Sequence, residues 1–225
     1  MIARTPEEVM KLIAEVNGNN CTVFIRNATP VRGRGTSTVW TNLSVEGIQE
    51  CQALSPLYLD LQARLTGTFG KPVFRHGGLP KHELTAWELF HPNQVDEDER
   101  IRQMISLHWI ERDGWWKRHQ SRGLNWMLCA AANTAELFRD QPLQQALTAV
   151  GSFLVSGFED AHLTIGVSNE PAVTLWLLMY ALVEPELAGL DYCQAYVVIS
   201  DLDSPWIQSV ADVSEVIKFC PDLPE

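Results

Sequence analysis

The C-terminal part of the sequence alternates between short apolar segments rich in β-branched residues and one longer apolar segment. Residues 162–167 and 195–200 have the composition of buried strands, and residues 172–182 between them have the length of a helix. Because the connection is long enough for a crossover, the two strands can be parallel neighbours. This strand–helix–strand unit favours folds in which helices cover a sheet.

The N-terminal residues carry a complete signal for the start of a helix. Thr5 can cap the helix, Pro6 suits its first position, Glu8 completes a capping box and Gly18 ends it. The pattern elsewhere predicts strands at residues 21–26, 37–41 and 73–74, and helices at residues 45–54, 56–65, 96–109, 124–138 and 144–150. We therefore expect a mixed α+β fold, one domain over residues 1–225 with about five strands and six to seven helices.

The net charge of −11 is unevenly distributed along the chain. Residues 1–139 carry 16 Lys and Arg against 15 Asp and Glu, whereas residues 140–225 carry one basic residue, Lys218, against 13 acidic ones. Such acids either face solvent together or pair with cations elsewhere in the fold. Two interpretations follow: an acidic surface that attracts a basic partner, or internal pairing with arginines of residues 1–139.

Cysteine usage and hydropathy suggest the compartment. The five cysteines are odd in number and far apart, which predicts reduced thiols rather than disulfides. The acidic pair Glu7 and Glu8 argues against a signal peptide, and the apolar run at residues 172–183 is too short to span a membrane. We expect a soluble, cytoplasmic protein.

Two aspartates, Asp201 and Asp203, follow the predicted strand at residues 195–200. Paired carboxylates at the carboxyl end of a strand suit Mg²⁺. The segment resembles the first motif of the haloacid dehalogenase family and the Asp-x-Asp of many glycosyltransferases, although Pro205 stands where the dehalogenase pattern has Thr or Val. The resemblance implies a metal-dependent hydrolase or transferase that uses Asp201 and Asp203. Outside that alternative, no cofactor or metal is predicted.

Two basic segments and a group of histidines are further candidates. Glycines at residues 33 and 35 accompany Arg32 and Arg34, which could hold phosphate. Residues 115–122 combine tryptophans with the cations Lys117, Arg118 and Arg122, as in proteins that bind single-stranded nucleic acid. Five of the six histidines lie between residues 76 and 119 without a metal-ligand spacing, and folding could still bring two imidazoles together.

Nucleophile signatures such as Gly-x-Ser-x-Gly are missing, which favours a protein without catalytic activity. The main hypothesis is an intracellular binding protein of inhibitor, immunity or adaptor type, similar in character to bacterial immunity proteins. Its acidic C-terminal surface would engage a basic protein partner. The candidate contact residues are Asp201, Asp203, Asp212 and Glu215. The metal-dependent enzyme is the alternative, and the second alternative is a nucleic-acid-binding protein. The sequence is also compatible with a homo-oligomer.

Overall fold

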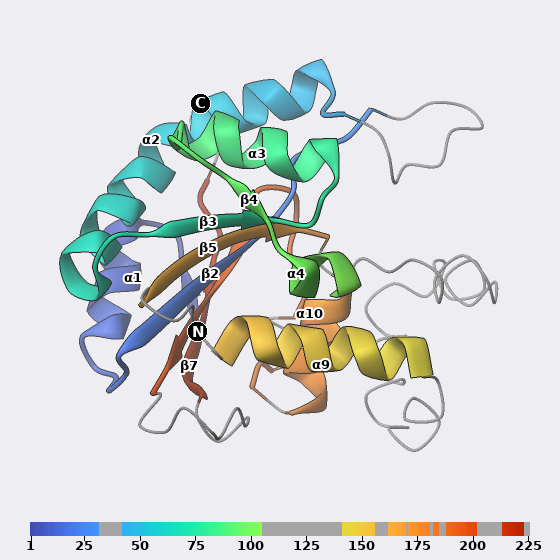
Figure 1. The fold of residues 1–225 in the computed structure, drawn as a ribbon. Coiled ribbons are helices and arrows are strands. Elements are labelled where there is room, and N and C mark those ends of the chain that lie inside the picture. The colour runs from blue at the N-terminus through green and yellow to red at the C-terminus, as the bar shows by residue number, and fades with distance from the viewer. Residues whose placement is uncertain are drawn as a thin grey trace.

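The structure is a computed structural model that describes residues 1–31, 42–104, 141–155, 162–169, 171–180, 182–184, 188–201 and 213–222. Its strands form one mixed sheet in the order β1-β7-β6-β2-β5-β3-β4 (Figure 1). The strands are β1 (Ile2–Ala3), β2 (Asn20–Arg26), β3 (Val73–His76), β4 (Asp96–Glu97), β5 (Leu163–Ser168), β6 (Ala195–Ser200) and β7 (Val213–Phe219). The helices are α1 (Pro6–Ile13), α2 (Val45–Phe69), α3 (Pro80–Phe90), α4 (Glu99–Met104), α9 (Gln141–Val155) and α10 (Pro171–Met179).

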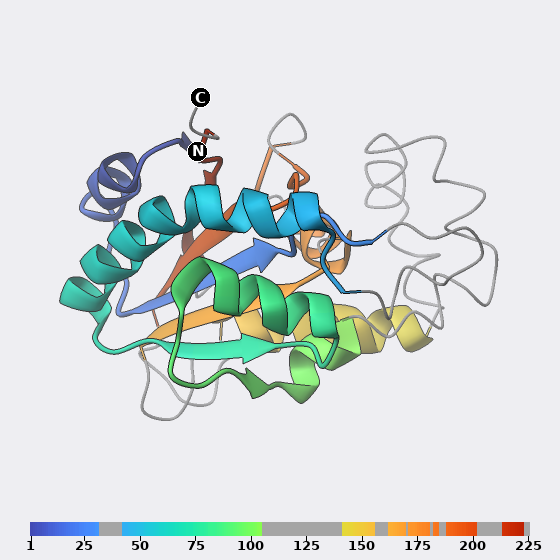
Figure 2. The same ribbon diagram turned by 90° about the horizontal axis from the view of Figure 1, so that it is seen from above.

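Helices cover both faces of this sheet (Figures 1 and 2). Helices α1, α2 and α3 pack on one face and share a hydrophobic core with Val23 and Ile25 of β2. Helices α4, α9 and α10 pack on the other face, in a second core that contains Phe24 of the same strand. Because successive side chains of a strand point to opposite faces, β2, which is buried from Asn20 to Ile25, supplies both cores.

The mixed fold class is confirmed, with more strands than expected. The sequence analysis missed β1 and β7, which pair with each other at one side of the sheet. The predicted parallel pairing of residues 162–167 with 195–200 is wrong. Strand β2 lies between β5 and β6, parallel to β5 and antiparallel to β6. Each strand of the predicted pair satisfies its backbone groups against β2 instead.

Two predicted helices, at residues 45–54 and 56–65, are one continuous helix, α2. Pro56 lies inside it on an exposed position, and Ser55 donates a hydrogen bond to the carbonyl oxygen of Leu89 at 2.9 Å. The buried residues of α2 before and after Pro56, including Leu54 and Tyr58, belong to the same core. Packing along this continuous face outweighs the local cost of the proline.

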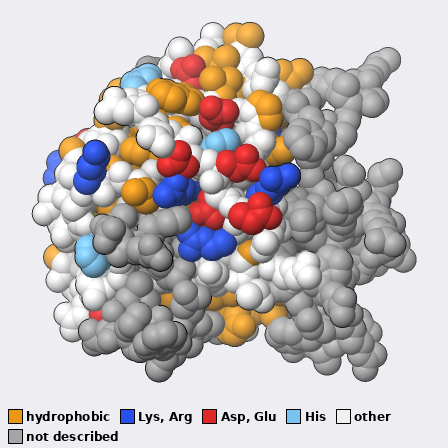
Figure 3. All heavy atoms as spheres, in the orientation of Figure 1, with side chains coloured by type: hydrophobic (Ala, Val, Ile, Leu, Met, Phe, Trp, Pro, Cys, Tyr) orange, Lys and Arg blue, Asp and Glu red, His pale blue; other side chains and the backbone are white. Residues whose placement is uncertain are grey.

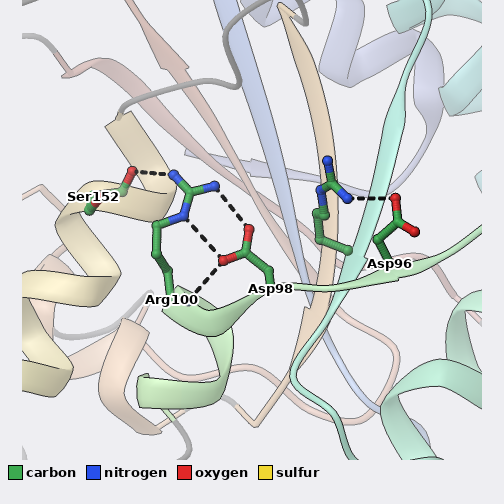
Figure 4. A network of polar contacts seen from close by, with 5 residues as sticks. Asp96, Asp98, Arg100 and Ser152 are labelled. Carbon is green, nitrogen blue, oxygen red and sulfur yellow. Dashed lines mark hydrogen bonds and ion pairs between the residues drawn. The ribbon is translucent and has the colours of Figure 1, made fainter.

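The predicted helix start at residue 96 is also displaced. Asp96 and Glu97 form β4 beside β3, and the Asp96 carboxylate pairs with Arg75 at 2.6 Å. The helix begins at Glu99, because the Asp98 carboxylate accepts the backbone N–H of Arg100 at 2.8 Å. The Arg100 guanidinium pairs with Asp98 at 2.9 Å and donates to the carbonyl oxygen of Ser152 at 3.2 Å, which ties α4 to α9 (Figure 4).

The helices among the described residues include none that is long and apolar enough to cross a membrane.

Replacing Pro56 with Ala should stabilise the protein. The proline has no N–H to donate to the carbonyl of Gln52, and Ala restores this helical hydrogen bond on an exposed position. We expect the free energy of unfolding to rise by about 2 kcal/mol. This value is the gain from the restored helix, less the stability that proline provides by restricting the unfolded chain. Chemical denaturation measures the gain, and Pro56→Gly should recover about 1 kcal/mol less than Pro56→Ala. Equal or lower stability of Pro56→Ala would contradict a continuous α2.

Candidate functional site

The carboxyl ends of the parallel strands β2, β5 and β3 lie at one edge of the sheet. After β2 the chain passes to α2, on one face, whereas after β5 it passes to α10, on the opposite face (Figure 2). The connections therefore diverge between two adjacent parallel strands. Such a switch point opens a crevice in which α/β proteins bind their ligands.

Residues 27–29, which follow β2, are held by three different elements. The backbone N–H of Asn27 donates to the carbonyl oxygen of Ser168 at 3.0 Å. The next N–H, of Ala28, donates to Thr85 Oγ1 at 3.1 Å, and that of Thr29 donates to the Glu50 carboxylate at 3.2 Å. Since β5, α3 and α2 each use one of these donors, this segment offers no backbone N–H to a ligand.

The first turn of α3 brings a Lys and a His to the same edge. Lys81 is 6% exposed and His82 is fully buried, although both residue types are usually on the surface or half-buried. His82 Nε2 lies 3.3 Å from Oδ1 of Asn169, the residue that follows β5. Because the amide oxygen only accepts, Nε2 carries the proton and Nδ1 carries a lone pair, for which the described residues provide no hydrogen-bond partner.

Burial shifts the protonation of both residues. Loss of hydration, and then the nearby Arg26, lower the pKa of Lys81 from 10.5 to about 8. Burial, followed by the charge of Lys81, lowers the pKa of His82 well below its usual value, and His76 adds a smaller effect in the same direction. Arg26 ends β2, His76 ends β3, and Lys81 and His82 lie on the first turn of α3, so the four residues are at this edge of the sheet. The edge therefore carries two cationic side chains and an imidazole whose pKa is lowered.

Arg26, the last residue of β2, is held in place by residues of the segment that precedes β6. Its guanidinium donates to the carbonyl oxygen of Leu190 and lies over the Tyr192 ring, 4.4 Å from the ring centroid. Arg26 is in register with Ser168 on β5, so the two side chains share a face of the sheet. The Ser168 hydroxyl is fully buried and has no hydrogen-bond partner among the described residues.

Of the histidines between residues 76 and 119, the structure brings His76 and His82 together. His76 ends β3, and its Nδ1 accepts the N–H of Gly78 at 3.2 Å. His91 lies at the other end of α3, and His108 and His119 lie outside the described residues. Within the described part of the chain, no group of three or more His, Cys, Asp or Glu side chains could hold a metal ion.

The residues predicted as partner or metal ligands lie elsewhere. Asp201 follows β6, whose last residue Ser200 pairs with the first residue of β2, so Asp201 is at the opposite edge of the sheet. Glu215 is on β7 and accepts the N–H of Val216 at 2.9 Å. Asp203 and Asp212 lie outside the described residues, as do the phosphate or nucleic-acid candidates Arg32, Arg34, Lys117, Arg118 and Arg122. The metal-dependent and nucleic-acid-binding hypotheses, which depend on residues of this set, stay predictions.

Sequence reasoning missed Arg26, Asn27, Lys81 and Asn169 as site residues. Their one sequence signal is position, since each directly ends or follows a strand or opens a helix. The segment 75–95, in which no helix was predicted before residue 96, contains α3 and therefore Lys81 and His82. Nothing local marks these residues as neighbours, because strand order decides which strand ends meet.

Comparison with known proteins identifies the fold. No protein-family model matches the sequence, and no curated protein matches it. A candidate phosphohistidine phosphatase, SixA, from Nakamurella multipartitia is 13% identical, covers 92% of this chain and 98% of its own, and superimposes with a TM-score of 0.50. A candidate α-ribazole-5′-phosphate phosphatase from Escherichia coli is 16% identical over 81% of this chain and 92% of its own, with a TM-score of 0.47. A mycobacterial glucosyl-3-phosphoglycerate phosphatase is 15% identical over 90% and 96%, with a TM-score of 0.46. At 13% identity the likeness to the Nakamurella protein shows a shared fold alone.

The predicted non-enzymatic inhibitor, immunity or adaptor protein with a basic protein partner is wrong. The solved structure that superimposes with a TM-score of 0.50 is described as a candidate phosphohistidine phosphatase. Some of the acidic residues also pair with arginines, which differs from the predicted acidic docking surface. Asp222 pairs with Arg4 across the two parts of the chain. On the face in Figure 3, arginines lie next to acids over β4 and α4, where Arg102 is 3.2 Å from Glu97.

Lys81→Met should stabilise the protein at neutral pH. The folded-state pKa of about 8 lies below the unfolded value of 10.5, so the unfolded state binds more protons between these values and stability rises with pH there. We expect the free energy of unfolding to increase by about 1–2 kcal/mol at pH 7, a gain that shrinks above pH 8. Denaturation across this range measures it. The exposed Lys71→Met control should change stability by less than about 0.5 kcal/mol, and a destabilised Lys81→Met would contradict the cost of burying the charge.

His82 should make the protein sensitive to acid. Folding keeps this imidazole neutral because its pKa is lowered, whereas the unfolded chain takes up its proton below about pH 6.5. The stability contribution is therefore full above that pH and is lost as the pH falls. His82→Gln should reduce the slope of unfolding free energy against pH by up to about 1.4 kcal/mol per unit between about pH 5 and 6. Urea denaturation of both proteins tests this, and identical slopes would refute it.

Proposed function

We propose that this chain is a phosphate-ester hydrolase that binds the phosphate group of its substrate at the carboxyl edge of β2 and β5. The observation that supports the proposal is the convergence of Arg26 and Lys81, with His76 and His82, at the switch point of the sheet. Cationic side chains at such a ligand-binding edge are suited to hold an anion.

Side chains rather than the backbone would hold the phosphate. The N–H groups of residues 27–29 are already used, so the loop after β2 does not form an anion-binding nest. Lys81 and Arg26 supply positive charge, and Asn169 presents its amide nitrogen because His82 holds its oxygen. A bound dianion would also favour the charged form of Lys81 and so raise its pKa again.

The strand ends suggest direct attack by water. Both β2 and β5 are followed by asparagine, and a carboxamide is a poor nucleophile. Water would therefore form the new bond to phosphorus while the ester P–O bond breaks and the alcohol leaves. The proton of the water passes to the alcohol oxygen that leaves, so the products are inorganic phosphate and the alcohol. Lys81 and Arg26 would stabilise the charge on the phosphoryl oxygens.

The shared fold supports this reading at the level of substrate class. The Nakamurella protein is described as a candidate phosphohistidine phosphatase, and its TM-score of 0.50 covers nearly the whole of both chains. Its name concerns that protein, and the cationic edge is the independent reason for proposing phosphate chemistry here.

The test combines turnover and binding. Hydrolysis of p-nitrophenyl phosphate would be followed by absorbance and binding of inorganic phosphate by calorimetry, for the wild type, Lys81→Met, Arg26→Gln and the exposed control Lys71→Met. We expect Lys81→Met and Arg26→Gln each to lower kcat/KM by about 100-fold or more, because each removes a charge that the transition state uses. The Lys71→Met control should match the wild type. Phosphate binding without turnover would contradict the hydrolytic step, and the absence of both would refute the site.

A further inference from the structure

Thr85 joins the two halves of the candidate site by hydrogen bonds. The residue lies on the second turn of α3 and is fully buried. Its hydroxyl donates to the carbonyl oxygen of Lys81 at 2.7 Å and accepts the N–H of Ala28 at 3.1 Å. One side chain therefore connects the turn that carries Lys81 and His82 to the segment that follows β2.

The chemistry of the hydroxyl fixes the direction of both bonds. A threonine hydroxyl has one proton, which the Lys81 carbonyl uses in the back-bonding pattern common for Thr in helices. The lone pairs remain, and one accepts from Ala28. The flanking N–H groups of Asn27 and Thr29 are bound by β5 and α2. Ala28 is fully buried, so losing this acceptor leaves an N–H without water.

We propose that Thr85 is a positioning residue, which sets the spacing between the end of β2 and the first turn of α3 and so matches Arg26 and Lys81 to a single phosphate group. This inference rests on the proposed phosphate site. Thr85 does not touch the phosphate; it acts through Ala28 and Lys81. A shift of the strand end by a fraction of an ångström is enough to weaken binding between two fixed cations.

Thr85→Val tests the inference, because valine keeps the shape and removes both hydrogen bonds, while Thr85→Ser restores the hydroxyl. The probe is inorganic phosphate, titrated by calorimetry. We expect about tenfold weaker binding for Thr85→Val, since an unsatisfied buried N–H is enough to displace the segment, and near wild-type binding for Thr85→Ser. Leu89→Val, a buried core change on the same helix, serves as the control for lost stability and should bind phosphate like the wild type.

Two further measurements need no phosphate. Hydrogen exchange of the Ala28 amide and NMR titration of the Lys81 ammonium should both change in Thr85→Val and stay as in the wild type in Leu89→Val. If neither changes in Thr85→Val, or if Leu89→Val weakens phosphate binding equally, the positioning role is overturned. If both change as expected but the wild type binds no phosphate, the spacing role holds and the proposed function fails.

Discussion

Strand β2 is paired along both of its edges, and the rest of the structure depends on this arrangement. It hydrogen-bonds in parallel to β5 and in antiparallel to β6, and its side chains enter both hydrophobic cores. The position at which the chain leaves this strand is therefore fixed. Residues 27–29 leave it at the switch point, where β5, α3 and α2 each bind one of their backbone donors. The backbone at the candidate site is therefore rigid and its polar groups are satisfied.

Because this backbone is fixed, the charged side chains at the edge are held in place and can indicate its function. Burial and the nearby Arg26 lower the pKa of Lys81 to about 8, which costs stability at neutral pH. Proteins retain such costs mainly where function requires them. The paired charges of β4 and α4 differ in kind, since Asp98 and Arg100 neutralise each other and join two helices. Arg26 and Lys81 instead bring two charges of one sign to the same edge of the sheet.

Local patterns predicted the elements whose cause is local. The Thr5 and Glu8 capping box starts α1 as expected, and the strand predicted at residues 195–200 coincides with β6. Prediction was wrong where distant contacts outweigh local preference. Pro56 does not end α2, because a continuous buried face packs on the sheet, and Asp96 joins a strand because Arg75 and β3 bind it.

The sequence by itself determined where β2 and β6 run, how α1 begins and that helices cover a sheet, because propensity, caps and hydrophobic periodicity act over a few residues. Only the tertiary structure decided that β2 lies between β5 and β6, and therefore that Asn27, Asn169, Lys81 and His82 share one edge while Asp201 lies at the other. Strand order is a property of long-range pairing, and no short segment encodes which strand ends will meet.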